Sequence, residues 1–336
     1  MKKLIKRLTS GNKKLMVSES AMEVLLKGKV WQLSEKQRAA MTISCKDSDS
    51  IPKVKAAGSV KTVAGQKVQI MHNGLQVKLG GYYGNWMAEI IKKLRGHHEP
   101  QEEKVFHEVL KKIGSKGTMI ELGSFWSYYS IWFNKTIKDA INVCCEPDPG
   151  NMDVGKENAK LNGADLKFVH AAAGSETGKR IEFTLESKPG ETLSVPIMSV
   201  DDILREQKIK SLDLLHMDVQ GVELEALRGA EQSIKAGKVR FVIVSTHHYL
   251  FSKDPMTHIK CINYIKSLGG HIIASHTVAE SYSGDGLIVA SFDGRDRHFT
   301  IPLSNNHTDQ SLFRPHENDL SILIDAYDEL LEQGIK

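Results

Sequence analysis

Acidic and histidine side chains stand where four expected strands end. "MIE" and "VCCE" end in Glu121 and Glu146, "LLHMD" ends in Asp218, and "VIVSTHH" ends in His247 and His248. Carboxylates gathered at one edge of a sheet could bind a ribose diol, offset the charge of a cationic ligand or hold a divalent ion. A histidine beside them could accept a proton at neutral pH. These residue types at these places predict a ligand-binding and catalytic edge.

The elements that must position these side chains alternate between strand and helix from Thr118 onward. This alternation predicts an α/β fold with a doubly wound, mostly parallel sheet of seven strands and helices on both faces. The connection at residues 277–285 is too short for a helical crossover, so the last strand is expected to be antiparallel. The expected strands are residues 118–122, 141–146, 166–172, 211–218, 239–245, 271–275 and 286–292, and the expected helices are residues 101–113, 125 onward, 151–161, 222–234 and 257–267.

The type of cofactor follows from the glycine and the acids. The first loop has a single glycine, Gly123, and lacks the G-x-G-x-x-G spacing of dinucleotide sites. Glu146 suits a ribose, because a carboxylate can accept hydrogen bonds from both hydroxyls, and Glu121 suits a cationic group. S-adenosylmethionine carries a ribose, an ammonium and a sulfonium, and its carboxylate could lie at the N-terminus of the next helix. We therefore expect this cofactor, with further contacts from Gly123, Ser124, Phe125, Pro147, Ala171, Ala172 and Asp218.

Structural roles compete with some of these assignments. Glu121 could cap the helix that follows it, and Ala171 and Ala172 could serve packing alone. Asp148 is expected to cap the next helix, and Asp201 is expected to be a helix N-cap rather than a catalytic acid. Asn158 is expected to be a solvated helix residue.

The catalytic candidates are Asp218, His247 and His216. Methyl transfer needs aligned reactants and a base near the acceptor hydroxyl, but no covalent nucleophile on the protein. We expect His247 to be the base and Asp218 to position the hydroxyl or the cofactor. Strand alternation places His216 on the same side as Asp218, although His216 could also be a core histidine. Nothing in the spacing demands a metal ion, and a divalent ion held by Asp218 and other acids stays open.

Aromatic residues near the expected cleft suggest the kind of acceptor. Aromatic rings with polar tips suit a sugar ring or another flat, partly polar molecule. Three glycines surround Tyr82, Tyr83 and Trp86, which suggests either a mobile segment that orders over a ligand or an ordinary packed loop. The substrate candidates are Tyr82, Tyr83, Trp86, His248 and Tyr282.

Four segments in this order resemble the FkbM-type S-adenosylmethionine-dependent methyltransferases. They are "MIELGSFWSYYS", "EPDPGNMDVGKENAKLNG", "VPIMSVDDIL" and "LDLLHMDVQGVELEALRGA". The resemblance covers roughly residues 98–292 and implies a Rossmann-like class I methyltransferase fold. It also implies an enzyme that O-methylates sugars or related small molecules. The sequence departs from the family pattern at Ser127, where a second glycine is usual, and at His216, where lysine is usual.

Two other classes of function stay open. One is a methyltransferase that acts on a nitrogen, a peptide or a nucleic acid, although no amino-methylation motif follows the strand at residues 211–218. The other is a cofactor-binding protein on the same fold that has lost activity. A nucleic-acid partner is disfavoured, and a small-molecule or carbohydrate acceptor is expected.

Length and composition set the domain organisation. The 336 residues suggest a basic extension (1–65), a hairpin and helix (66–115), the methyltransferase core (116–292) and a C-terminal extension (293–336) that ends in a helix. That helix could pack on the sheet or pair with a second copy as a homodimer. The four cysteines lack metal-ligand spacing and are expected to be buried thiols in a reducing cytoplasm. No apolar run reaches the length of a membrane span.

Overall fold

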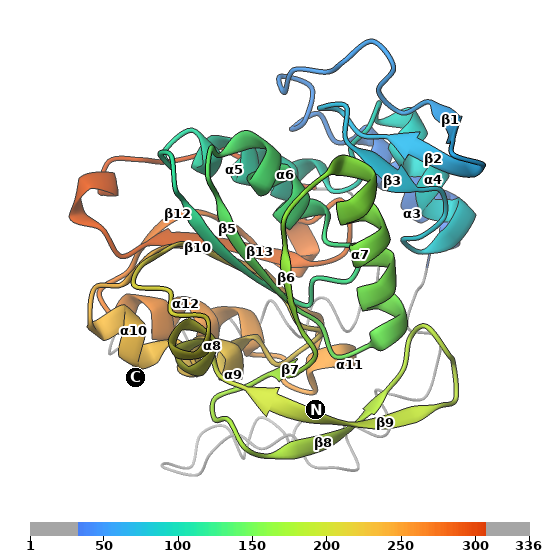
Figure 1. Ribbon diagram of the computed structural model, residues 1–336. Coiled ribbons are helices and arrows are strands. Elements are labelled where there is room, and N and C mark those ends of the chain that lie inside the picture. The colour runs from blue at the N-terminus through green and yellow to red at the C-terminus, as the bar shows by residue number, and fades with distance from the viewer. Residues whose placement is uncertain (1–32, 307–336) are drawn as a thin grey trace, which may run out of the picture.

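A seven-stranded sheet forms the centre of the computed structural model, which describes residues 33–306 (Figure 1). Strand β13 is antiparallel to both of its neighbours, and the other pairs are parallel. The expected mostly parallel sheet with an antiparallel last strand is therefore confirmed. In spatial order the strands are β12 (His271–His276), β13 (Gly286–Ser291), β11 (Val239–Thr246), β10 (Leu212–Asp218), β4 (Thr118–Leu122), β5 (Ile141–Cys145) and β6 (Lys167–Val169).

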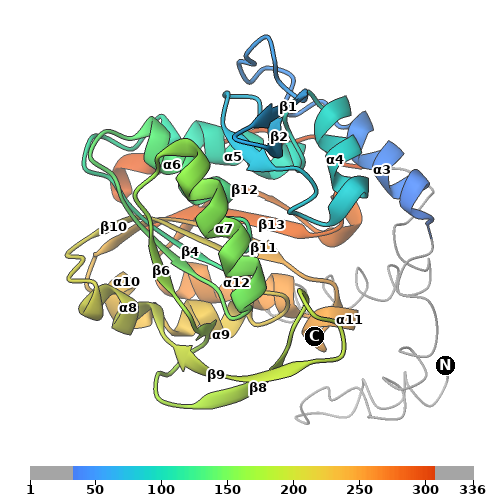
Figure 2. The ribbon, with the colours of Figure 1, turned by 45° about the vertical axis from the view of Figure 1, so that its right-hand side comes forward.

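Helices cover both faces of the sheet because its central strands are apolar on both sides. Every residue of β4 and of β13 is buried, as expected of strands that lie between two layers of helices. One hydrophobic cluster lies under α5 (Pro100–Leu110), α6 (Tyr128–Thr136) and α7 (Pro149–Asn162). The other lies under α8 (Val200–Glu206), α9 (Glu223–Arg228), α10 (Glu231–Lys235) and α12 (Thr257–Ser267). Figure 2 shows α7 and α12 on opposite sides of the strands.

The segment before the core contains elements that the sequence analysis did not assign or assigned differently. Helix α3 (Glu35–Ser44) begins with a capping box at Ser34. The expected hairpin is present as β2 (Gln66–Ile70) and β3 (Gln76–Lys78), but residues 71–75 join its strands. The two-residue turn lies instead at Ala64-Gly65, between β1 (Val60–Val63) and β2. The suggested mobile or loop segment around Trp86 contains helix α4 (Gly84–Lys93).

A further small sheet is formed by the part of the sequence between β6 and α8. It consists of β7 (Ala172–Ala173), β9 (Thr192–Met198) and β8 (Arg180–Thr184), and β8 and β9 form an antiparallel hairpin. The sequence analysis did not predict this hairpin. The remaining short elements are α11 (Tyr249–Ser252), η1 (Val278–Glu280) and η2 (Gly294–Asp296).

Three helix-capping and surface expectations can be compared with the structure. Asp148 caps α7, as expected, by accepting from the Gly150 amide at 2.8 Å. Ser199, and not Asp201, caps α8; Asp201 instead accepts from the backbone of α10. Asn158 is fully buried rather than solvated. Its side chain donates to the Trp126 carbonyl and accepts from the Lys78 backbone amide.

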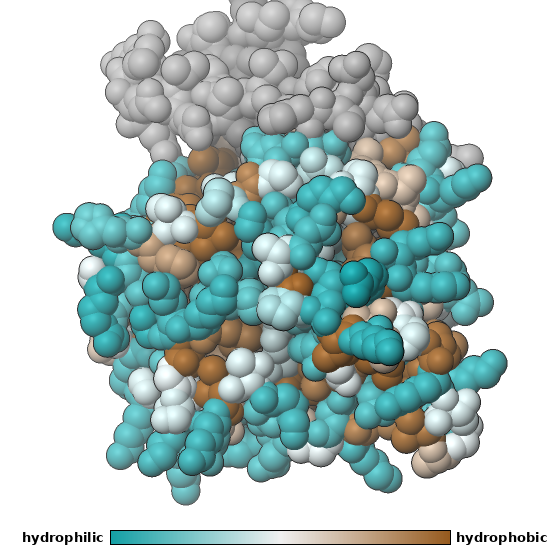
Figure 3. Space-filling model, turned by 90° about the horizontal axis from the view of Figure 1, so that it is seen from above, coloured by the Kyte–Doolittle hydropathy of each residue, from teal (hydrophilic) through white to brown (hydrophobic). Residues whose placement is uncertain are grey.

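The surface and the thiols agree with the composition. The face in Figure 3 is mostly hydrophilic, with scattered hydrophobic patches. All four cysteines are buried and free. None of the helices within residues 33–306 has the length and apolar character that crossing a membrane requires. The basic stretch 1–16 and the expected C-terminal helix lie outside the described residues, and the domain boundaries stay predictions.

Candidate functional site

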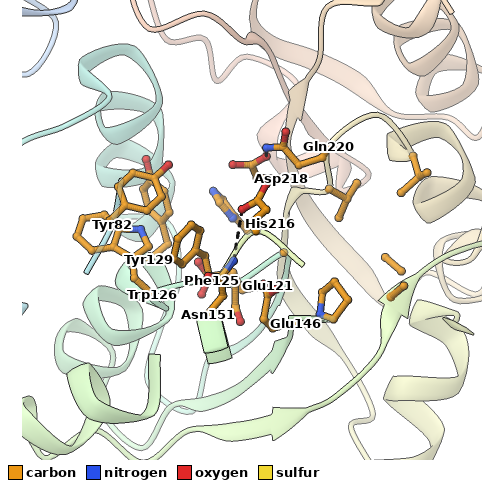
Figure 4. A pocket seen from close by; sticks show the side chains of 18 of the residues that line it. Tyr82, Glu121, Phe125, Trp126, Tyr129, Glu146, Asn151, His216, Asp218 and Gln220 are labelled. Carbon is orange, nitrogen blue, oxygen red and sulfur yellow. Dashed lines mark hydrogen bonds between the residues drawn. The ribbon is translucent and has the colours of Figure 1, made fainter. Parts of the chain in front are cut away.

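A cavity lies beyond the carboxyl ends of β4, β5 and β10, where the sequence analysis placed the site (Figure 4). We call it the first cavity. Most of the expected cofactor and catalytic residues, and two of the aromatic ones, line it together. These residues are Tyr82, Tyr83, Glu121, Gly123, Ser124, Phe125, Glu146, Pro147, Ala172, His216 and Asp218.

The loop after β4 has an unusual backbone. Gly123, Phe125 and Ser127 have φ values of 72°, 38° and 56°, all in the left-handed region. A Cβ atom at Gly123 would lie 1.8 Å from the carbonyl oxygen of Asp218. A glycine is therefore required at position 123 because a side chain there would collide with the end of β10, whether or not a ligand also approaches the loop. Helix α6 starts at Tyr128 rather than near Phe125.

Glu121 both caps a helix and lines the first cavity. Its carboxylate accepts from the Ser130 amide of α6 at 3.0 Å, and the residue is 3% exposed. Burial raises the pKa of Glu121 to about 7, even though His216 and the Ser130 amide favour the charged form. A cation in the cavity would compensate this charge, so the two readings of Glu121 in the sequence are compatible.

Glu146 is held rigidly at the end of β5. One carboxylate oxygen accepts from the Phe125 amide at 2.8 Å, and the other accepts from the Asp148 amide at 2.9 Å. Burial raises the pKa of Glu146 to about 8 despite these two bonds. Each oxygen can accept a second hydrogen bond, so the carboxylate can still receive two hydroxyls from the cavity side.

Aromatic rings form one wall of the first cavity (Figure 4). Tyr82 stacks on Trp126 with ring centres 4.5 Å apart, and the Phe125 ring meets Tyr82 edge-on at 5.1 Å. Side chains that the sequence analysis did not select complete the lining, several of them from the unpredicted β8–β9 hairpin. They include His98, Glu99, Trp126, Asn151, Ile181, Phe183, Glu186 and Gln220.

A second cavity adjoins the first. The two share lining residues that include Tyr82, Glu99 and Asp218, so Asp218 lies at their junction. His247 and Trp86, both expected in the site, line the second cavity rather than the first. Its other lining residues include Glu35, Arg38, Phe251 and Asp285.

His247 lies close to three carboxylates in the second cavity. Its Nδ1 lies 2.5 Å from Glu223, and its Nε2 lies 3.2 Å from Asp218 and 3.6 Å from Asp285. Burial lowers the pKa of His247, but Asp285, Asp218 and Glu223 outweigh it and raise this pKa well above 6.5. At Asp218, burial raises the pKa, but His247, His216 and Gln220 outweigh it and lower the pKa. His247 is therefore an imidazolium among three carboxylates.

His216 belongs to the floor of the first cavity. Its Nε2 lies 2.9 Å from Glu102 of α5, which also accepts from the Ser245 hydroxyl at 2.5 Å. Burial lowers the pKa of His216, but Glu102 outweighs it and raises the pKa. His216 thus lines the cavity and also fixes α5 against the sheet.

Three expected site residues lie outside the linings of both cavities. Ala171 is fully buried, and its carbonyl accepts from Cys145. His248 is buried as the N-cap of α11, where its Nδ1 accepts from the Leu250 amide at 3.3 Å, and is not on the surface. Tyr282 packs with Met41. Neither cavity lining contains His248 or Tyr282, and the acceptor contacts expected of them stay predictions.

The strand order, the antiparallel β13 and the cavity beyond the strand ends define a Rossmann-like methyltransferase fold. Residues 108–272 match the family model described as the methyltransferase FkbM domain. The chain thus contains a methyltransferase domain of the FkbM family, as the sequence segments indicated. No curated protein matches the chain.

Solved structures with a similar fold share little sequence with the chain. Cofactor-bound Rv0187 from MTB is 14% identical with a TM-score of 0.39, over 59% of this chain and 82% of that one. The N-terminal domain of human METTL16 in complex with SAH is 15% identical with a TM-score of 0.36, over 57% of this chain and 70% of that one. Precorrin-6y C5,15-methyltransferase from Geobacter metallireducens is 12% identical with a TM-score of 0.36, over 56% and 87%. Likeness at this level supports no statement about ligand or acceptor.

Proposed function

We propose that the protein is an S-adenosylmethionine-dependent O-methyltransferase that acts on a hydroxyl of a sugar, glycoconjugate or related small molecule. The observation that supports this most is the pair of adjoining cavities that meet at Asp218. The first cavity has the groups that the cofactor needs, and the second offers a separate place for the acceptor. The FkbM methyltransferase domain spans the strand ends that build both.

The residues of the first cavity fit S-adenosylmethionine. Glu146 can receive the two ribose hydroxyls, because both of its oxygens are fixed by backbone amides and keep free lone pairs. Glu121 is a buried carboxylate without a lysine or arginine partner among residues 33–306, so a cationic ligand would relieve its desolvation. Tyr82, Phe125 and Trp126 supply apolar faces that exclude water. When bound, the cofactor supplies an electrophilic methyl group on a sulfonium sulfur.

The protein side of the reaction is positioning and proton transfer. Asp218 lies between the cavities and can orient the acceptor hydroxyl. An imidazolium cannot accept a proton, so we propose that His247 fixes Asp218 rather than acting as the base expected from the sequence. Trp86 and Tyr83 line the second cavity, where aromatic faces suit a sugar ring. The free thiols favour a reducing compartment such as the cytoplasm.

Replacing Glu146 by alanine should weaken S-adenosylmethionine binding by about 10- to 100-fold, since hydrogen bonds to a charged partner contribute about 1.5–3 kcal/mol. Isothermal calorimetry measures the dissociation constant. Glu176→Ala removes a 68% exposed carboxylate and should leave it unchanged. Tight binding of a nicotinamide dinucleotide in place of S-adenosylmethionine would contradict the assigned cofactor.

The acceptor is tested by mass spectrometry on methyl glycosides of glucose, galactose and rhamnose and on catechol, each with S-adenosylmethionine. A mass gain of one methyl group on a glycoside is the expected result. Transfer to an amine, a peptide or an oligonucleotide but to no hydroxyl would show that the proposed hydroxyl acceptor is wrong. Cofactor binding without transfer to any of these would indicate a binding protein without activity.

A further inference from the structure

Asp285 is a carboxylate of the second cavity that the mechanism above does not use. It lies in the loop between η1 and β13 and shares the cavity lining with Asp218 and His247. Two glycines flank it. Gly284 has a φ of 129°, and a Cβ atom at Gly286 would lie 2.5 Å from the hydroxyl oxygen of Thr246. The loop is therefore packed closely against the end of β11, which fixes the position of Asp285 at the cavity wall.

The Asp285 carboxylate differs from its neighbours in its hydrogen bonds. Asp218 accepts from the Gln220 side chain at 3.2 Å, and Glu223 accepts from the Gly221 amide at 2.8 Å and contacts His247. Among residues 33–306, no donor makes a hydrogen bond to the Asp285 carboxylate; its nearest cation is His247 Nε2, at 3.6 Å. The side chain is 32% exposed, so its lone pairs can reach a molecule in the cavity.

The surroundings also bring the pKa of Asp285 close to neutral pH. Burial raises the pKa of Asp285 to about 7, with His247 lowering it and Asp218, Glu99 and Glu102 raising it further. A general base is most effective when its pKa lies near the working pH. The charged and titratable groups around it come from every neighbouring element: Arg38, Tyr82, Tyr83, Glu99, Glu102, Asp218 and His247.

We propose that Asp285 is the general base of the methyl transfer, and that Glu223 and His247 are positioning residues that fix it opposite Asp218. This rests on the proposed function. Glu223 holds Nδ1 of the imidazolium, which leaves Nε2 3.2 Å from Asp218 and 3.6 Å from Asp285. An imidazolium in that place keeps two neighbouring carboxylates close together, which like charges alone would oppose.

In the methyl transfer, the acceptor hydroxyl oxygen attacks the methyl carbon, forming a C–O bond as the C–S bond breaks. The electron pair of the C–S bond stays on sulfur, which becomes a neutral thioether. The O–H bond of the acceptor breaks, and its proton goes to an Asp285 oxygen, from which water later removes it. No oxidant, reductant or metal ion is required.

Replacing Asp285 by asparagine tests the proposal. We expect kcat on the methyl glycosides at pH 8 to fall by at least about 100-fold, as for the loss of a general base, with S-adenosylmethionine affinity within about threefold of wild type. Asp153→Asn, which changes a 71% exposed side chain, should keep the wild-type kcat. Glu223→Gln should move the acid limb of the rate profile to higher pH, because a less firmly held imidazolium stabilises the Asp285 carboxylate less.

A measurement without any acceptor separates this proposal from the proposed function. Infrared difference spectra of the protein with S-adenosylhomocysteine, taken between pH 5 and 9, should show a carboxyl signal near pH 7 that is smaller by one group in Asp285→Asn, while Glu121 and Glu146 still titrate in both proteins. A kcat of Asp285→Asn within threefold of wild type would overturn the proposal. So would identical carboxyl titrations in the wild type and Asp285→Asn, even if no glycoside is methylated.

Discussion

Replacing Gly123 by alanine should lower the free energy of unfolding by about 3 kcal/mol and abolish cofactor binding. The new Cβ atom would lie 1.8 Å from the Asp218 carbonyl oxygen, so β4 and β10 must separate at the edge that builds the site. An L-residue at a φ of 72° adds about 1 kcal/mol. Crowding of this kind costs about 1–3 kcal/mol more. Urea unfolding and calorimetry with S-adenosylmethionine measure the two effects.

Gly163→Ala is the matched control for this change. Gly163 ends α7 with a φ of 55°, but no atom lies within 4 Å of the position that a Cβ atom would take there. It should therefore lose only about 1 kcal/mol, the cost of the left-handed backbone, and bind the cofactor normally. Equal losses in the two variants would show that the close approach to Asp218 is unimportant.

The central sheet could be predicted from the sequence because its strands are short, buried apolar runs. Strands such as Thr118–Leu122 and Gly286–Ser291 are completely buried, and their limits follow the apolar residues. The β8–β9 hairpin was missed for the opposite reason. Strand β8 has four exposed residues and one half-buried residue, so it carries no periodic pattern to recognise. Its side chains nonetheless close the first cavity.

The candidate site could be predicted only in part. Acids at strand ends are visible locally, since the carboxyl ends of parallel strands converge, and Glu121, Glu146 and Asp218 do line one cavity. Contacts between segments far apart in the sequence cannot be predicted from the local sequence pattern. His216 and Glu102 are 114 positions apart, and their contact depends on how α5 packs on the sheet. The contact of His247 with Asp285, 38 positions further along the chain, likewise cannot be predicted from the local sequence.

Glu103, a buried carboxylate of α5 beside the site, is the second residue whose replacement should have a large effect. Glu103 of α5 is fully buried and accepts from His97 Nδ1, from the His98 amide at 2.8 Å and from His98 Nδ1 at 2.6 Å. Burial alone would raise the pKa of Glu103, but the two histidines lower it. Burial likewise opposes charge on His98, but Glu99 and Glu103 outweigh it and raise the pKa of His98 to about 10. The segment "HHEP" is thereby anchored under both cavities.

Replacing Glu103 by glutamine should cost about 3–5 kcal/mol of unfolding free energy, since it removes one of the two carboxylates that stabilise the buried imidazolium of His98. Glu108→Gln, on the same helix and paired with Lys111 at the surface, should cost less than about 1 kcal/mol. Urea midpoints at pH 6 measure both. A loss below about 1 kcal/mol for Glu103→Gln would show that Glu103 does not pair with a charged His98.

The pH dependence of stability distinguishes an ion pair from a neutral hydrogen bond at this place. The folded-state pKa of His98 lies above its ordinary value of 6.5, so its contribution is fully present below pH 6.5 and is lost as pH rises through about 10. The folded-state pKa of Glu103 lies below its ordinary 4.5, so its contribution is present above pH 4.5 and is lost on further acidification. Wild-type stability should therefore fall between pH 6.5 and 10 more steeply than that of Glu103→Gln. Parallel curves for the two proteins would show that Glu103 does not stabilise the charge on His98, and would rule out the anchoring of α5 through this ion pair.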